Sequence, residues 1–395
     1  MRYLLAVFFF LSVGAAWAQE GGQWYKGNLH THSLWSDGDD FPEMIMDWYK
    51  SHGYDFVSLS DHNTLAEGEK WKLVPAHKFR QRRFQEYLAK YGKDWVTYKT
   101  DSLGRINVRL KTLAEYRPKF EEQGKFLILQ AEEITDKFED KSIHVGAINV
   151  QEVIKPQGGN SVAQTMQNNL DAVYAQRKRT GQPMFPHINH PNFRWSVKVN
   201  DMKELRGERF FEVYNGHPHV HNYGDSATLG MEALWDQLLI HYLKAGKPLL
   251  YGLATDDSHD YLEFKAGASN PGRGWVMVKA KDLTPNALVD AMEKGDFYAT
   301  TGVELQNLSY KKNKLALKVK PKPGVTYTIQ FWGAKTAGTS EKSQLLKEVK
   351  GLQADYKVSK KDLYVRAKVI SSQPQENPFQ AGDLETAWIQ PVVRQ

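Results

Sequence analysis

The sequence predicts an α/β domain followed by a small all-β domain. Three observations support this: short apolar strands alternate with helix signals over the first three quarters of the chain, only period-two alternation follows, and the change falls near Gly302. With 395 residues, the chain is long enough for about two domains. It has no Cys, which excludes disulfides, thiolate metal ligands and a cysteine nucleophile.

The first 18 residues have the pattern of a secretory signal peptide. Arg2 precedes an apolar run from Leu4 to Val13, and Ala16-Trp17-Ala18 offers a small-residue cleavage site. The apolar run is too short to span a bilayer comfortably, so a cleaved signal is favoured over a membrane anchor. We therefore expect a periplasmic or secreted protein without a membrane anchor.

Eight strand candidates alternate with helix signals in the expected first domain, residues 19–302. The strands are expected at Gly27–Thr31, Phe56–Ser60, Phe126–Ala131, Ile143–Val150, Pro183–Ile188, Phe210–Tyr214, Leu249–Ala254 and Trp275–Lys279. Helix signals include Thr284-Pro285, an N-cap followed by proline at the first helical position, with Gly295 ending that helix. This alternation is typical of a parallel α/β sheet or barrel. Residues 67–123 interrupt it and are interpreted as an insertion, which could be a lid.

Residues 303–395 are expected to form the second domain, a sandwich-like β structure. Its strands are expected at Leu315–Val319, Thr326–Phe331, Leu363–Ile370 and Ala387–Val392. From Thr301 onward there are 16 Lys and Arg against 8 Asp and Glu. Because these lysines are spread evenly and alternate with apolar residues, they are interpreted as solvated strand faces, and no nucleic-acid partner is expected.

Nearly every predicted strand of the first domain ends in residues that bind metals well. His30 and His32 share one face of an extended segment, and Asp257 and His259 have the same spacing. Similar positions carry Asp61, His62, Glu132, Glu133, His144, His187, His190 and Asp256. A lone His-x-His pair is weak, but donors at successive strand ends predict one metal-binding rim, because barrel active sites lie at the carboxyl ends of the strands. Imidazole and oxygen donors suit Zn, Mn or Fe.

These segments resemble the motifs of the PHP (polymerase and histidinol phosphatase) superfamily. The matching segments are Asn28-Leu29-His30-Thr31-His32-Ser33 with Ser36-Asp37-Gly38, Ser60-Asp61-His62-Asn63, Glu133-Ile134 with His144 downstream, His190-Pro191, and Asp257-Ser258-His259. The resemblance covers about residues 24–302. It implies a distorted (β/α)₇ TIM-like barrel with a two- or three-metal centre, and it is greatest to secreted members that carry a C-terminal β-domain.

The resemblance also implies a set of metal ligands. One divalent ion would be held by His30, His32, Glu133 and Asp257, a second by Glu133, His144 and His190, and a third by Asp37, His62 and His259. Glu133 is preferred to Glu132 because the family's glutamate usually precedes an aliphatic residue. Asp61 and Asp256 are interpreted as partners that orient ligating imidazoles, while His187 is expected in the core or beside a ligand, or exchanging roles with His190.

This donor set predicts a hydrolase that uses a metal-activated hydroxide, with a small phosphate ester as the favoured substrate. The expected proton donor to the leaving group is either water or an acidic residue such as Asp256. Arg194 and Arg273 are candidates for phosphate binding, with an ordinary surface arginine an equal alternative. Residues 212–221, which include His217, His219 and His221, are interpreted as a substrate loop rather than a fourth metal site.

Two other functions are compatible with the sequence. Some relatives of the secreted branch hydrolyse carbamates or esters, so the chain could be a metal-dependent carbamate, amide or carboxylic-ester hydrolase. Alternatively, an inert barrel could serve as an envelope- or glycan-binding protein. The complete ligand set disfavours inertness, and the β-domain is interpreted as a packing partner.

Overall fold

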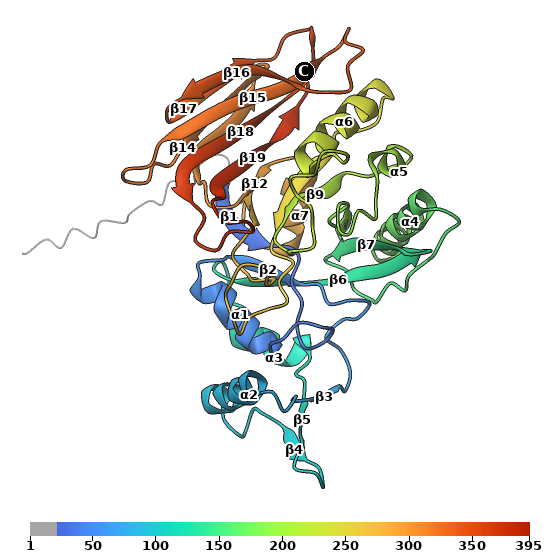
Figure 1. The fold of residues 1–395 in the computed structure, drawn as a ribbon, viewed down its shortest axis with the longest axis vertical. Helices are drawn as coiled ribbons and strands as arrows, with labels where there is room; N and C mark the ends of the chain where they lie inside the picture. Colours follow the sequence, from blue (N-terminus) through green and yellow to red (C-terminus); the bar gives the residue numbers. More distant parts are fainter. Residues whose placement is uncertain (1–21) are drawn as a thin grey trace, which may run out of the picture.

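The computed structural model describes residues 22–395 (Figure 1). The export signal expected at residues 1–18 lies outside the described residues. Within residues 22–395, no helix combines the length and the apolar character that crossing a bilayer requires.

The first part of the chain has a mixed α/β fold. Outside residues 67–123, its elements are β1 (Gln23–Asn28), α1 (Pro42–Ser51), β2 (Phe56–Leu59), β6 (Leu127–Phe138), β7 (Lys141–Ile148), α4 (Val162–Thr180), β8 (Phe185–Ile188), α5 (Val199–Lys203), β9 (Phe210–Asn215), α6 (Met231–Lys244), β10 (Tyr251–Thr255), β11 (Trp275–Ala280), α7 (Pro285–Glu293) and β12 (Phe297–Thr300). All eight expected strands overlap an observed one. However, β1 ends at Asn28, so His30 and His32 follow the strand rather than ending it.

The helix boundaries follow from their caps. Ser161 accepts a hydrogen bond from the main-chain N–H of Gln164 at the start of α4, and Gly181 ends that helix in the left-handed conformation. Thr284 caps α7 in the same way, with Pro285 at its first position. α7 therefore begins at its predicted cap, and it ends at Glu293, just before the predicted end at Gly295.

The large sheet is mixed, whereas the alternation predicted a parallel one. The strand order is β10-β9-β8-β7-β6-β2-β1-β11-β12, continuing into the C-terminal strands, and β7 is antiparallel to both neighbours. Only Glu139 and Asp140 separate β6 from β7, and so short a connection allows only an antiparallel pair. A parallel bridge between Thr31 and Ser258 joins the segments that follow β1 and β10. The carboxyl ends of β10 and β1, the first and seventh strands of this order, are therefore adjacent.

Residues 67–123 form a compact insertion. It contains β3 (Trp71–Leu73), α2 (Lys78–Tyr91), β4 (Tyr98–Thr100), β5 (Ile106–Arg109) and α3 (Leu113–Phe120), with a separate sheet of order β3-β5-β4. In Figure 1 it lies at the end of the molecule opposite the C-terminal strands. Phe84 and Tyr87 of α2 share an apolar cluster with Trp35 and Phe41 of the loop after β1. The insertion therefore packs on a loop that carries candidate ligands.

Residues 303–395 contain β13 (Leu305–Lys311), β14 (Lys314–Val319), β15 (Tyr327–Lys335), β16 (Gln344–Lys350), β17 (Gln353–Lys357), β18 (Asp362–Pro374) and β19 (Leu384–Val392). The order β12-β19-β18-β15-β16 continues the large sheet, and β13-β14-β17 form a second one. Leu317 of the second sheet shares a buried core with Ile329 and Val369 of the first. This region is all-β, and its main sheet is continuous with that of the α/β part.

Candidate metal centre

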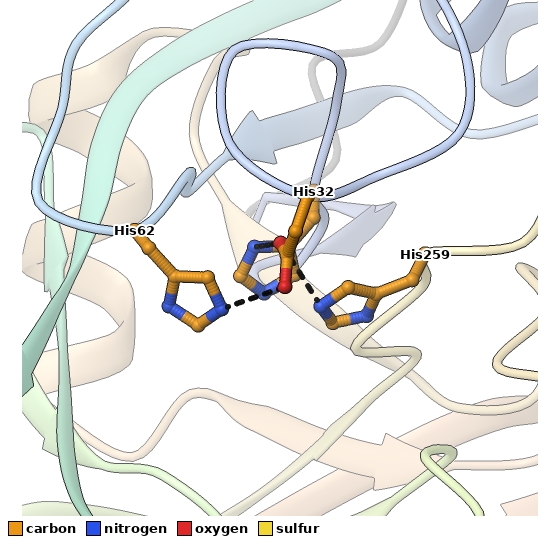
Figure 2. Close-up of side chains that lie close together, drawn as sticks. His32, His62 and His259 are labelled. Atoms are coloured by element: carbon orange, nitrogen blue, oxygen red, sulfur yellow. Dashed lines mark ion pairs between the residues drawn. The ribbon is translucent and has the colours of Figure 1, made fainter. Parts of the chain in front are cut away.

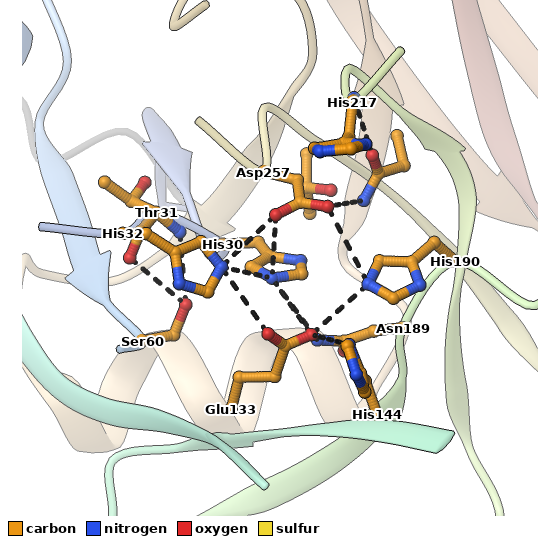
Figure 3. Close-up of polar contacts among 12 residues, drawn as sticks. His30, Thr31, His32, Ser60, Glu133, His144, Asn189, His190, His217 and Asp257 are labelled. Atoms are coloured by element: carbon orange, nitrogen blue, oxygen red, sulfur yellow. Dashed lines mark hydrogen bonds and ion pairs between the residues drawn. The ribbon is translucent and has the colours of Figure 1, made fainter. Parts of the chain in front are cut away.

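The segments after β1 and β10 run side by side and bring three donor residues together. The N–H of His32 donates to the carbonyl of Ser258 over 2.9 Å, and the N–H of Asp257 donates to the carbonyl of His30 over 3.0 Å. These main-chain bonds place His30 and His32 next to Asp257. The Oδ1 atom of Asp257 lies 3.2 Å from the Nε2 atoms of both histidines (Figure 3).

Glu133 on β6 is the carboxylate shared by most of the cluster. Its Oε1 atom lies 3.1 Å from His144 Nδ1 and 3.3 Å from the Nε2 atoms of both His30 and His190. Its Oε2 atom lies 3.5 Å from His32 Nε2. Burial raises the pKa of Glu133, but the charges of His144 and His30 outweigh burial and bring it well below its usual value. The carboxylate is therefore ionised and central.

Asp37 organises a second, more open group (Figure 2). Its carboxylate lies 3.4 Å from His259 Nε2, 3.5 Å from His62 Nε2 and 3.7 Å from His32 Nδ1. The side chain of Asp37 is 58% exposed, whereas that of His32 is fully buried. The group thus faces solvent on one side and adjoins the buried cluster through His32.

A tight turn places Asp37. A Cβ on Gly38 would lie 2.6 Å from main-chain atoms of His32 and Ser33, so only glycine fits there. Asp61 accepts hydrogen bonds from the main-chain N–H groups of Ser33, over 2.8 Å, and Ser36, over 3.0 Å. We expected Asp61 to orient an imidazole; instead it holds the loop that carries Asp37.

Two candidate ligands have strained main chains. Asp257 has φ 48° and His190 has φ 22°, both in the left-handed region that non-glycine residues seldom occupy. Such conformations cost about 1–3 kcal/mol each and concentrate at functional sites. These two conformations therefore reduce the stability of the fold, and they direct both side chains into the cluster.

Glu212 on β9 supports the donor cluster through hydrogen bonds, a role that the sequence did not predict. Its Oε1 lies 2.7 Å from His30 Nδ1 and accepts from the Thr255 hydroxyl, while its Oε2 accepts from the N–H of His190 and from Asn215 Nδ2, both over 2.8 Å. Such carboxylate–imidazole pairs fix ring orientation in metal sites. The sequence signal was a lone Glu inside the apolar segment 210–214.

The described donors form five adjoining groups that could hold metal ions. They are His32, Asp37, His62 and His259; His30, His32 and Glu133; His30, His190 and Asp257; His30, His187 and Glu212; and His62, Glu133 and His144. All nine side chains expected as ligands occur in these groups, together with His187 and Glu212. His187 is fully buried and lies 3.7 Å from Glu212 Oε1, so it belongs to the layer beneath His30.

Buried polar atoms in the cluster lack protein partners. His62 Nδ1 is 2.7 Å from Glu133 Oε2, but the alignment is not that of a hydrogen bond, and this buried oxygen has none among residues 22–395. The same holds for His144 Nδ1. Since unpaired buried donors and acceptors cost about 1–3 kcal/mol each, divalent cations fit this arrangement and the chemistry of its donors.

The pKa values of the imidazoles differ widely within the cluster. Burial and the neighbouring His259 and His62 lower the pKa of His32 to about 3. Burial also disfavours charge on His62, but Glu133 and Asp37 outweigh it and raise the pKa of His62 to about 11. Without other cations, the carboxylates thus draw protons onto some of the rings. Divalent ions would supply the same positive charge to neutral imidazoles.

Several expected site residues lie outside the cluster. Glu132 points away from it: its Oε1 accepts from the N–H of Ile154, and burial raises its pKa to about 8. Asp256 is fully buried, with Oδ1 bound to the N–H groups of Arg273 and Gly274 and Oδ2 bound to the hydroxyl of Tyr49. It neither orients an imidazole nor faces a substrate, so both roles expected for it are wrong.

The two arginines differ. The guanidinium of Arg273 is buried and donates to the main-chain carbonyls of Gly216 and Ala268. Arg273 therefore holds two loops together. The prediction that it contacts the substrate phosphate is corrected accordingly. The exposed side chain of Arg194 lies over Phe193, whose ring is 5.0 Å from that of His190. Arg194 therefore remains near the rim.

These features define a candidate multinuclear metal centre. No protein-family model and no curated protein matches the chain. Several solved structures are similar to the chain. A two-domain protein from Bacteroides vulgatus, containing a predicted PHP-like metal-dependent phosphoesterase, is 16% identical with TM-score 0.40, covering 94% of this chain and 96% of its own.

Two further solved structures match a part of the chain. A proposed metal-dependent phosphoesterase from Bifidobacterium adolescentis is 14% identical with TM-score 0.29, covering 60% of this chain and 88% of its own. An amidohydrolase from Chromobacterium violaceum, with bound sulfate and no metal, is 12% identical with TM-score 0.29, covering 59% and 87%. Similarities this low do not assign a function to the chain.

Proposed function

We propose that the chain is an exported metal-dependent hydrolase that cleaves small phosphate esters. The observation that carries the proposal is the sharing of Glu133 among five imidazoles from four separate segments of the chain. A carboxylate shared between adjoining donor groups is suited to holding neighbouring cations, which would supply Lewis acidity for a displacement at phosphorus.

The proposed ligands fall into three adjoining sites. His30, His32, Glu133 and Asp257 would hold one divalent ion, Glu133, His144 and His190 a second, and Asp37, His62 and His259 a third. Zn, Mn or Fe would supply a Lewis acid and lower the pKa of a water molecule there. The protein fixes these ligands through Glu212 and through the Asp61-bound turn. Arg194 at the rim is the proposed contact to the substrate phosphate.

The fold supports the same proposal. The seven strands from β10 to β1 are hydrogen-bonded in order, and the bridge between Thr31 and Ser258 links the two ends of this series. We interpret this arrangement as a distorted barrel over the described residues 22–302 of the proposed domain 19–302, with the donors at its carboxyl-end rim. Residues 303–395 are the proposed β-domain, and residues 1–18 the proposed cleavable signal that sends the protein to the periplasm or the medium.

The test combines metal analysis with a substrate panel. Protein loaded with Zn or Mn should contain two or three ions per chain by elemental analysis and should hydrolyse phosphate monoesters or diesters. The His30→Ala variant should lose metal and turnover while its far-UV circular dichroism is unchanged. The exposed His52, at the end of α1, provides the control His52→Ala, which should keep both.

The same panel should include carbamates, amides and carboxylic esters. Turnover of these substrates alone would show that the centre works at carbonyl carbon and would overturn the phosphoesterase proposal. Full activity in the His30→Ala variant would overturn metal catalysis altogether.

A further inference from the structure

His217, in the loop after β9, has a ring whose orientation and hydrogen bonding suit contact with a substrate. We propose that its Nε2–H donates a hydrogen bond to the leaving-group oxygen of the ester bound at the metal centre. This inference rests on the proposed hydrolase function and assigns it a specific substrate contact.

Main-chain hydrogen bonding selects the tautomer of His217. The N–H of His219 donates to His217 Nδ1 over 3.2 Å. A nitrogen that accepts a hydrogen bond carries no proton, so in the neutral ring the proton is on Nε2. Within residues 22–395, the Nε2 atom of His217 forms no hydrogen bond. This atom is also not fully buried, so it can be reached by a ligand. The ring therefore has an available N–H donor.

The position of the ring is set by the donor cluster itself. The N–H of His217 donates to Asn215 Oδ1 over 2.8 Å, and Asn215 Nδ2 in turn donates to Asp257 Oδ2 over 3.2 Å. In Figure 3, His217 lies beyond Asp257, on the side away from Glu133. One amide thus links a candidate ligand to the backbone of His217, so the ring and the metal centre are positioned together.

Aromatic packing restricts the ring further. Its centroid is 5.5 Å from those of both His259 and Phe193, with edge-to-face angles of 74° and 68°. Edge-to-face contacts on two sides leave a rigid ring that is only partly exposed. A rigid donor loses little entropy on binding a ligand, as a preorganised catalytic contact requires.

Asp256, the residue expected to assist the leaving group, is unable to do so. Its carboxylate is enclosed and accepts hydrogen bonds on both oxygens. By contrast, His217 is partly exposed and contacts His259, a member of the more open group. A neutral imidazole N–H can stabilise negative charge that builds up on a reacting oxygen.

The bond changes balance without a further reactant. A water oxygen bonds to phosphorus, the bond to the leaving oxygen breaks, and its electron pair stays on that oxygen. The hydrogen bond from His217 stabilises this charge, and the proton released by the attacking water finally neutralises it. The imidazole begins and ends in the same neutral tautomer.

The first test compares leaving groups. His217→Phe keeps a ring but removes the donor, whereas His217→Gln keeps an N–H. For a series of aryl to alkyl phosphate esters, His217→Phe should lower kcat by about 100-fold on poor leaving groups and much less on 4-nitrophenyl phosphate. Bound metal should be unchanged, and His217→Gln should recover part of the loss. His52→Phe should behave as the parent. An equal loss across the series, or none, would overturn the proposal.

Two further readouts do not depend on turnover. Nitrogen-15 NMR of the imidazoles, with His217 assigned by its absence in His217→Phe, should show Nδ1 unprotonated; the opposite tautomer would contradict the proposal. Inorganic phosphate should bind Zn-loaded His217→Phe about tenfold more weakly than Zn-loaded parent, a loss of about one hydrogen bond.

These experiments distinguish a failure of the phosphoesterase proposal from a failure of the His217 proposal. If the parent hydrolyses only carbonyl esters, the phosphoesterase proposal fails, while the same comparison on carboxylic esters of graded leaving groups still tests His217. Unchanged phosphate affinity together with unchanged leaving-group dependence would reject His217 and leave the metal hydrolase intact.

Discussion

At the scale of single residues, the orientation of each candidate ligand depends on the residues that hydrogen-bond to it. Glu212 binds His30 Nδ1 and the N–H of His190 with its two oxygens, so one carboxylate positions two candidate ligands. Burial raises its pKa, but the charge of His30 and the contacts with His187 and His30 outweigh burial and lower it. The negative charge of Glu212 is therefore available to polarise His30.

Glu212→Gln tests this role. The amide places a donor where the N–H of His190 or the ring of His30 needs an acceptor, so the affinity for Zn should fall by about 10- to 100-fold. Competition titration against a chromophoric chelator measures the affinity. Glu132→Gln is the matched control, since Glu132 on β6 faces away from the cluster, and its affinity should be unchanged. Equal affinities in both variants would contradict the role of Glu212.

Glu208, remote from the centre, offers a pH test. Burial raises its pKa to about 8: Oε1 accepts from the N–H of Phe210, and Oε2 is buried without a partner among residues 22–395. The native state thus binds this proton more tightly than the unfolded state, where the pKa is 4.5. Its contribution to stability is complete below that value and is lost as the pH rises towards 8.

The comparison is between the parent and Glu208→Gln in urea unfolding at pH 5 and pH 8.5. The difference in the free energy of unfolding should move in favour of Glu208→Gln at the higher pH, by about 1.4 kcal/mol per unit of pKa shift. A difference that is the same at both pH values would contradict the raised pKa.

Residue types and spacing predicted the candidate ligands, but not their supports. Seven of the nine expected donors follow strands, and strand ends meet at one rim whatever the details of packing. The other two, Glu133 and His144, lie within β6 and β7. The role of Glu212 was not predicted, and the roles predicted for Asp61 and Asp256 differ from their contacts, because the environment of a buried carboxylate is defined by partners far away in the chain. Asp256 and Asp257 are adjacent in sequence, yet one faces loop N–H groups and the other the histidines.

At the scale of elements, the insertion of residues 67–123 clamps the loop after β1. Lys72 donates to the carbonyl of Ser36 over 2.8 Å, and Lys70 and Arg80 donate to the carbonyls of Trp35 and Asp39. Arg83 Nε lies 2.9 Å from Asp40 Oδ1. The sequence indicated an insertion but not its contacts; this part of it stabilises the turn that carries Asp37.

Removing the buried charge pair should weaken that clamp. Asp40 is fully buried, so Arg83→Met leaves its carboxylate without its cation, and the free energy of unfolding should fall by about 3–5 kcal/mol. Adding Asp40→Asn should recover part of this loss. The control is Arg82→Met on the exposed side of α2, which should cost less than about 0.5 kcal/mol. Similar losses in the two single variants, measured by urea unfolding, would contradict the clamp.

The whole molecule is joined by one sheet. β12 pairs with β19, where Tyr298 faces Ile389, so the main strands of residues 303–395 extend the sheet of the α/β part. Gln390 on β19 bonds both the N–H and the carbonyl of Gly252 on β10. The change of pattern near Gly302 predicted two domains, but strand pairing across the boundary was not visible in it.

We therefore expect one cooperative unfolding transition in calorimetry, because the two parts share strand pairs. Gln390→Ala leaves the buried N–H and carbonyl of Gly252 without partners and should lower that single transition by several degrees. Gln353→Ala, on the exposed side of β17, is the control and should leave it unchanged. Two separated transitions in the parent would show that the parts fold independently.

The most direct measurement is a crystal structure of the Mn- or Zn-loaded protein with anomalous diffraction at the metal absorption edge. Two or three anomalous peaks should lie among His30, His32, Glu133, His190 and Asp257 and beside Asp37. A loaded protein with no peak within this cluster, or with metal bound only elsewhere on the chain, would contradict the metal centre.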